Sequence, residues 1–153
     1  VKRKYQIKIR IAQREVAKEM ARIIVEMIRI RTQGEGFGTN GKLGPLDEKY
    51  IEQRRKSKRL SSKTSPEKSN ATATGQMIDA LNGSSSGNTA KVVIKDSSRR
   101  KELNGGKSSL TNNEVRQFFE DNGREFLKLS PDEKKEMVDV ATKLIKERLK
   151  DLL

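Results

Sequence analysis

The sequence predicts a single α+β domain, with a long N-terminal helix and a C-terminal helix packed on a small antiparallel sheet and with long polar loops. Two helical repeats of apolar residues, one in the first fifth of the chain and one at its end, indicate the helices. A β-branched segment at residues 91–95 (KVVIK) indicates the sheet. The length of 153 residues is typical of one domain, so residues 1–153 are assigned to a single unit.

Residues 1–31 are predicted to form a basic amphipathic helix, with its apolar seam beginning at about Gln6. The seam recurs at steps of three and four residues and comprises Ile9, Ala12, Val16, Met20, Ile23, Met27 and Ile30. Further apolar residues widen this stripe, so the helix is expected to pack on a sheet, a neighbouring subunit, or both. Four glycines within residues 34–41 end the helix, and residues 32–44 are predicted to be a Gly-rich connector.

Residues 45–129 are predicted to form the α+β body. A short, strongly basic helix is expected at 46–58, followed by an exposed, flexible loop at 61–73 that is rich in Ser, Thr, Lys and Asn. Residues 74–81 are predicted to be a short turn or helix, 82–88 (NGSSSGN) a turn, and 96–109 a second flexible loop. Asn112 or Asn113 is predicted to cap a helix that Gly123 ends.

The strongest local signal opens the C-terminal helix, predicted at 130–153. Ser130 is suited to the N-cap, Pro131 to the first helical position, and Glu133 to the reciprocal contact of a capping box. The predicted apolar seam of this helix comprises Val138, Ala141, Ile145, Leu149 and Leu152.

Composition excludes several classes of chemistry. The chain has no Cys, His or Trp, which removes thiolate nucleophiles, disulfides, Cys/His zinc sites and imidazole catalysis. It has no run of 18 apolar residues, and charged residues interrupt its N-terminal segment, so we expect neither a membrane span nor a signal peptide. Paired carboxylates at Glu120–Asp121 and Asp132–Glu133 are interpreted as solvated helix ends. We therefore expect no enzyme, no metal and no cofactor.

The formal charge of +13 is unevenly distributed. Residues 108–153 carry 9 bases and 10 acids, so the excess lies in the N-terminal segment and the two loops. The candidate interface or DNA-facing residues are Lys2, Arg3, Lys4, Arg54, Arg55, Lys56, Lys58, Arg59, Arg99, Arg100 and Lys101. They are compatible with a solvated face, a protein contact or a nucleic-acid contact. Stacking aromatics are not interleaved with these clusters, which disfavours sequence-specific recognition.

The glycines at 34–41 follow a helix rather than a strand, which disfavours a nucleotide-binding loop.

Several separated segments, taken in order, resemble motifs of tailed-bacteriophage virion morphogenesis proteins, in the Mu-like tail-completion (neck, head-tail joining) group. These segments are residues 44–50 (GPLDEKY), 73–81 (ATGQMIDAL), the strand at 92–94 (VVI) and residues 118–130 (FFEDNGREFLKLS). The family-motif residues are Pro45, Leu46, Tyr50, Thr74, Gly75, Met77, Leu81, Gly123, Arg124, Phe126, Leu127 and Leu129. The chain departs from the family at residues 70–73 (NATA), where apolar residues are usual.

The resemblance implies an α+β subunit of a virion that assembles into a ring or adaptor at the head-tail junction or tail end. Its partners would be further copies of itself, other neck or tail proteins and, non-specifically, DNA. Gly75 and Gly123 would serve backbone turns, and Arg124 would be an anchor near the sheet or a neighbouring subunit. The expected core residues are Leu46, Tyr50, Met77, Leu81, Phe126, Leu127 and Leu129. The main alternative is a basic cellular nucleic-acid-binding module, ribosome- or chromatin-associated. An enzyme using carboxylates is a weaker third interpretation.

Overall fold

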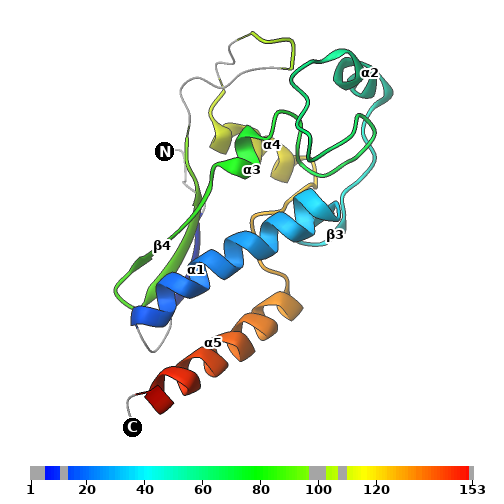
Figure 1. Ribbon diagram of the computed structural model, residues 1–153. Helices are drawn as coiled ribbons and strands as arrows, with labels where there is room; N and C mark the ends of the chain where they lie inside the picture. The colour runs from blue at the N-terminus through cyan, green and yellow to red at the C-terminus, as the bar shows by residue number, and fades with distance from the viewer. Residues whose placement is uncertain (1–5, 11–13, 97–102, 107–109, 152–153) are drawn as a thin grey trace.

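The computed structural model describes residues 6–10, 14–96, 103–106 and 110–151, and these form a small α+β fold (Figure 1). In chain order the elements are β1 (Gln6–Arg10), α1 (Arg14–Ile28), the π-helix η1 (Arg29–Gly34), β2 (Phe37–Gly38), β3 (Gly41–Lys42), α2 (Glu48–Lys56), α3 (Gln76–Asp79), β4 (Leu81–Ser86), β5 (Thr89–Ile94), α4 (Asn112–Asp121) and α5 (Pro131–Asp151). The predicted fold class is therefore confirmed.

The main sheet is antiparallel, with the strand order β1-β5-β4. Its register pairs Ile7 with Val92 and Leu81 with Ile94. Two sequence predictions are wrong here. Residues 6–10 form a strand rather than the start of the helix, because the alternation in QIKIR matches the two-residue period of a strand pairing with β5. The segment predicted as a turn at 82–88 is mostly strand β4, since pairing along the whole of β5 outweighs the weak strand preference of Gly and Ser.

Helix α1 covers one face of this sheet (Figure 1). Its inward face is fully apolar, and the buried residues are Val16, Ala17, Met20, Ala21, Ile24, Val25 and Ile28. The sheet meets it through the alternate β5 residues Ala90, Val92 and Ile94. Strand β4 approaches so closely that a Cβ on Gly83 would lie 2.7 Å from the carbonyl oxygen of Ala21. The core therefore lies between α1 and the sheet, as the wide stripe on this helix predicts.

The predicted Gly-rich connector at 32–44 is folded. Thr32 and Gln33 are buried in η1, and β2 pairs with β3 in a short antiparallel hairpin. The hairpin is joined to the segment between α4 and α5 by a hydrogen bond of 2.8 Å from the Thr39 amide to the Glu125 carbonyl oxygen.

Helix α5 packs on α1, on the side away from the sheet (Figure 1). The predicted capping box is confirmed: the Ser130 amide donates to Glu133 Oε2 at 2.9 Å, and the Glu133 amide donates to Ser130 Oγ at 3.2 Å. Arg31 Nη1 of η1 donates to both carboxylate oxygens of Glu133, at 2.7 and 2.6 Å. This buried Arg31 contact fastens the beginning of α5 to the end of α1.

The seam predicted for α5 is rotated relative to the observed one. Val138 is 64% exposed and Leu149 is 47% exposed, whereas Met137 is buried. The residues that pack against the core from α5 are Met137, Val140, Ala141, Leu144 and Ile145. Both sets recur at helical steps, so only the docking of α5 on α1 distinguishes them. Leu152 lies outside the described residues.

The predicted N-cap of α4, Asn112 or Asn113, is wrong, because the helix begins one or two residues earlier than either would allow. Thr111 is its N-cap, with its hydroxyl accepting from the Glu114 amide at 3.2 Å. Asn112 and Asn113 instead donate to the carbonyl oxygens of Lys95 and Ile94, at 3.0 and 2.9 Å, and so hold α4 to the end of β5. Gly123 follows the helix with φ of 72°, as expected for a left-handed C-terminal residue.

Candidate functional site

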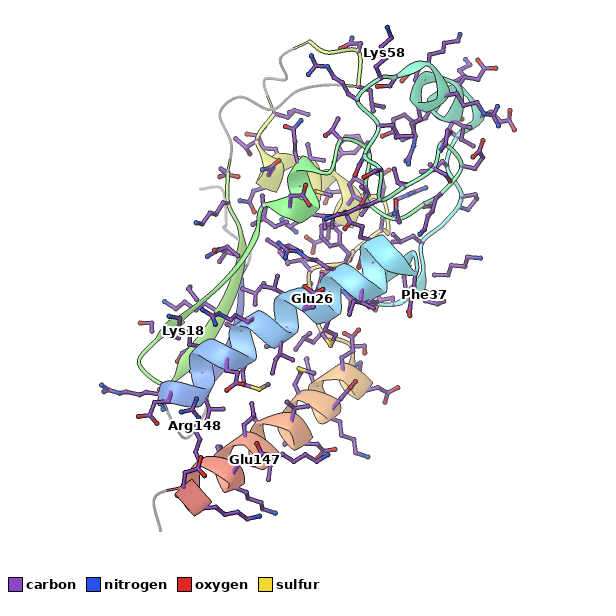
Figure 2. All side chains as sticks on the ribbon, viewed as in Figure 1. Lys18, Glu26, Phe37, Lys58, Glu147 and Arg148 are labelled. Carbon is purple, nitrogen blue, oxygen red and sulfur yellow. The ribbon has the colours of Figure 1, made fainter. Side chains whose placement is uncertain are left out.

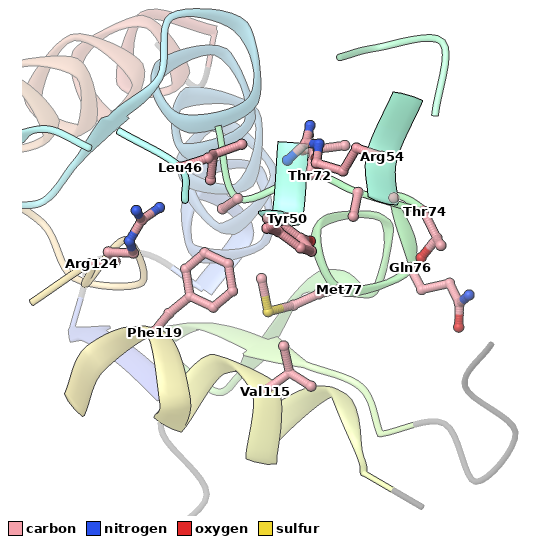
Figure 3. Close-up of a pocket in the computed structure, with 13 residues that line it drawn as sticks. Leu46, Tyr50, Arg54, Thr72, Thr74, Gln76, Met77, Val115, Phe119 and Arg124 are labelled. Carbon is pink, nitrogen blue, oxygen red and sulfur yellow. Dashed lines mark hydrogen bonds between the residues drawn. The ribbon is translucent and has the colours of Figure 1, made fainter. Parts of the chain in front are cut away.

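Residues from three separate segments of the sequence converge on one small cavity of about 90 Å³ beside α2 (Figure 3). Its walls come from α2 with the residues just before it, from α3 with the loop that leads into it, and from α4 with the chain just after it. The lining residues are Leu46, Tyr50, Arg54, Ala71, Thr72, Ala73, Thr74, Gly75, Gln76, Met77, Val115, Phe119 and Arg124.

Half of the predicted family-motif residues line this cavity, namely Leu46, Tyr50, Thr74, Gly75, Met77 and Arg124. Four more are buried in the adjoining core: Leu81, Phe126, Leu127 and Leu129. The core assignment is wrong for Leu46 and Tyr50, which are only part-buried because they face the cavity. Gly75 adopts φ of 85°, which confirms its predicted role in a backbone turn.

Arg124 is an anchor, but it holds loops of its own chain rather than the sheet. Its Nη1 donates to Ser69 Oγ at 3.0 Å and its Nη2 donates to the Pro45 carbonyl oxygen at 2.6 Å. The exposed Pro45 and the part-buried Arg124 thus connect the first and last motif segments directly.

Arg54 is buried, so its assignment to the interface or DNA-facing surface is wrong. Only 2% of it is exposed, and its Nη2 donates to Thr64 Oγ1, to the Ser65 carbonyl oxygen and to the Thr72 carbonyl oxygen, at 2.9, 2.8 and 3.0 Å. Burial lowers the pKa of this guanidinium, although Tyr50 and Glu67 act in the opposite direction. Arg54 therefore organises the loop at 61–73 from within.

The prediction that the loop at 61–73 is exposed is wrong at its C-terminal end, which is packed against the fold. Asn70 and Thr72 are buried, and the side-chain amide of Asn70 donates to the Gln33 carbonyl oxygen at 2.6 Å. The side-chain amide of Gln33 in turn donates to Thr72 Oγ1 at 3.2 Å. Where the family usually has apolar residues, this chain has buried polar ones that are satisfied by hydrogen bonds.

The remaining described basic candidates are exposed around α2. Arg55 lies 2.7 Å from Glu67 as an exposed ion pair, and its hydrogen bond lowers the pKa of the Glu67 carboxyl. Lys56, Lys58 and Arg59 line an open cleft of about 700 Å³. The other residues of its lining are Tyr50, Gln53, Ser57, Ala73, Thr74, Leu103 and Asn104. In Figure 2, Lys58 lies at the opposite end of the molecule from Arg148 of α5.

Six of the predicted basic candidates lie outside the described residues: Lys2, Arg3, Lys4, Arg99, Arg100 and Lys101. Of the eleven predicted basic candidates, the described part of the chain therefore brings together three, Lys56, Lys58 and Arg59, at the C-terminal end of α2.

The sequence predicts Tyr50 as a motif residue of the core, but not its position beside the basic residues of the cleft. It lines both the cavity and the cleft, and the Cζ atom of Arg54 lies 5.6 Å from its ring centroid. Tyr50 is separated from Lys56 and Lys58 in sequence, but Tyr50, Gln53 and Ser57 follow each other at helical steps of three and four. This spacing is the signal that places an aromatic residue beside the basic cluster.

The paired carboxylates are occupied in structural contacts. Glu120 lies 2.7 Å from Arg116 and 3.4 Å from Lys128. Burial alone would raise the pKa of the Glu120 carboxyl, but the hydrogen bond and charge of Arg116 outweigh it and lower the pKa. Glu133 is held by Arg31, as above. Among the described residues, no group of three or more carboxylates is placed to hold a metal ion.

No described helix combines the length and apolar character needed to cross a membrane. Comparison of the chain with protein-family models, with curated proteins and with solved structures found no match.

Proposed function

We propose that the protein is a non-enzymatic structural subunit of a tailed-phage virion, which acts as a ring-forming or adaptor protein of the neck or tail-completion type. The observation that carries this proposal is the convergence of the motif residues on one place in the fold. Leu46, Tyr50, Met77 and Arg124 are up to 78 residues apart in sequence, yet they line one cavity, and Arg124 bonds directly to the Pro45 carbonyl oxygen. Motifs that meet in space support a family resemblance more strongly than their order in the sequence alone.

The surface of the fold is compatible with assembly. Six large apolar side chains are exposed among the described residues: Ile30, Phe37, Leu110, Phe118, Val138 and Leu149. Val138 and Leu149 lie on α5, which is packed against the rest of the fold along one stripe only. Such residues suit contacts with neighbouring subunits in a larger particle.

The cleft lined by Lys56, Lys58 and Arg59 favours the second candidate function, a basic nucleic-acid-binding module of cellular origin. The two candidates predict different locations. A virion subunit is recovered in particles or their assembly intermediates, whereas a cellular module is recovered with ribosomes or chromatin.

Deletion of the gene from the phage or prophage that carries it tests the proposal. Electron microscopy of lysates is expected to show unjoined heads and tails, and the wild-type gene supplied in trans should restore joined particles. Arg124→Ala, which breaks the contact to Pro45, should restore few particles. The matched control Arg22→Ala, at an exposed position on α1, should restore them fully. Two results together would refute the virion assignment: a normal yield of infectious particles from the deletion, and absence of the protein from wild-type particles.

A further inference from the structure

We propose that the cleft at the C-terminal end of α2 binds a nucleotide unit, with Lys56, Lys58 and Arg59 contacting phosphate and Tyr50 offering an aromatic surface to the base. This inference concerns one site and holds independently of the assembly role. Two sources share this chemistry, a free nucleotide and a nucleotide within a nucleic-acid strand.

The size and composition of the cleft suit such a ligand. Its volume of about 700 Å³ lies within the range of about 300–1,000 Å³ that small-molecule sites occupy. Of its described lining residues, three are cations and none is a carboxylate. A cleft lined by one sign of charge, between protein walls of low dielectric constant, concentrates ions of the opposite sign.

The two walls of the cleft are joined by a hydrogen bond. Ser57 Oγ donates to the Leu103 carbonyl oxygen at 2.5 Å and accepts from the Arg59 amide at 3.1 Å. The Arg59 guanidinium lies against Gly105, where a Cβ would be 3.0 Å from Nε, and Gly105 has a φ of 90° that favours glycine. The planar guanidinium of an arginine suits paired hydrogen bonds to phosphate oxygens.

Thr74 adds an unused hydrogen-bonding group. Its hydroxyl oxygen is buried and has no hydrogen-bond partner within the described part of the chain, and the residue lines both the cavity and the cleft. Buried hydroxyls are normally paired, so a ligand oxygen or a water molecule is expected to complete it.

Tyr50 distinguishes a nucleotide from a simple anion. The side chain is part-buried, and the Arg54 guanidinium stacks on its ring at 5.6 Å, which restrains the ring where it borders the cleft. A basic groove combined with an aromatic surface is the arrangement that single-stranded nucleic-acid binders use without reading sequence.

The test measures binding of the full chain to a fluorescein-labelled oligothymidylate of about 20 nucleotides by fluorescence anisotropy, a probe long enough to cover the site of about 4–16 nucleotides typical of such binders. The triple variant Lys56→Gln/Lys58→Gln/Arg59→Gln is expected to weaken binding about tenfold or more. It should also reduce the slope of log affinity against log salt by about 2 units, since each phosphate contact to a single strand contributes about 0.7. The matched triple Lys134→Gln/Lys135→Gln/Lys143→Gln removes the same charge from exposed positions of α5 and should weaken binding less than about threefold by long-range electrostatics alone.

Tyr50 is tested separately. Tyr50→Leu should weaken binding severalfold without changing the salt slope, and Tyr50→Phe should bind as wild type does. Urea unfolding midpoints measured for each variant separate loss of the site from loss of the fold.

Competition identifies the source of the ligand. Displacement of the probe by thymidine monophosphate indicates a free-nucleotide site, whereas displacement by unlabelled oligonucleotide alone indicates a strand-binding site; both support the proposal. Equal weakening by the two triple variants, absence of binding to both ligands, or tighter binding of polyglutamate than of either ligand would overturn it.

Discussion

Arg54 shows how a single residue gives a loop without regular structure a defined shape. It belongs to the densest basic cluster of the chain, yet it is buried and donates three hydrogen bonds to the loop at 61–73. The adjoining Arg55 is exposed and forms an ion pair with Glu67. Two neighbouring residues of one type therefore have different roles, because consecutive positions of a helix lie on different sides of it.

We predict that Arg54→Met lowers the free energy of unfolding by about 2–4 kcal/mol, because it leaves the carbonyl oxygens of Ser65 and Thr72 without their buried donor. Arg55→Met removes only an exposed ion pair and is expected to change it by less than about 0.5 kcal/mol. Urea denaturation followed by circular dichroism measures both. Equal unfolding midpoints for the two variants would mean that the loop does not depend on Arg54.

Strand β4 lies directly against the backbone of α1 at Gly83. A Cβ on Gly83 would lie 2.7 Å from the Ala21 carbonyl oxygen and 3.2 Å from the Ala21 Cβ. Backbone atoms cannot move aside as a flexible side chain can, so the strand and the helix would have to separate.

Gly83→Ala is therefore expected to destabilise the fold by about 1–3 kcal/mol, the usual cost of overpacking a core. Gly44→Ala is the matched control, because a Cβ at Gly44 would meet no atom within 4 Å. Thermal unfolding is expected to show a lower midpoint for Gly83→Ala and little change for Gly44→Ala. A wild-type midpoint for Gly83→Ala would show that β4 can shift away from α1 at no measurable cost.

Elements with a local signal could be predicted from the sequence, and elements made by distant pairing could not. The Ser130–Glu133 capping box and the β-branched centre of β5 are encoded by adjacent residues, and both are present. Strand β4 has the sequence LNGSSS, which resembles a turn until β5 pairs with all of it. The rotated seam of α5 likewise depends on its contact with α1, which no periodicity within the helix reveals.

The candidate site, too, could be predicted from the sequence only where the signal is local. The motif residues were found from their order in the sequence, and the basic residues from their density. Their separation into a buried Arg54 and an exposed trio at Lys56, Lys58 and Arg59 required the geometry of α2 and of the loop at 61–73. The place of Tyr50 between cavity and cleft is a property of the fold and not of any one motif.

At the scale of the whole molecule, charge determines how the fold responds to acid. The chain carries 34 bases against 21 acids, so protonating the acids increases an existing positive excess and its self-repulsion. The carboxyls of Glu67 and Glu120 have pKa values below the ordinary value of 4.5 in the folded chain, through their contacts with Arg55 and Arg116. Ionised carboxylates of this kind favour the folded state.

The sign of the pH dependence follows from these lowered pKa values. A carboxyl with a pKa that folding depresses contributes stability that is fully present above its unfolded pKa, near 4.5, and that is lost as the pH falls through its folded pKa. The free energy of unfolding is therefore expected to fall as the pH decreases below about 4.5, where the unfolded chain takes up protons before the folded one does.

Glu120→Gln identifies the contribution of one group to this fall. At pH 7 the variant should be less stable than wild type by about 1 kcal/mol, because the buried Arg116 exchanges a charged hydrogen-bond partner for a neutral one. Once the pH has fallen below the lowered pKa of Glu120, the wild-type carboxyl is itself protonated, so the two proteins should converge. Glu52→Gln, at an exposed position on α2, is the control and should follow the wild-type curve at every pH. Urea unfolding across this pH range measures the difference in the free energy of unfolding between wild type and Glu120→Gln. If that difference did not narrow in acid, the ionised Glu120 carboxylate would not be what stabilises the fold.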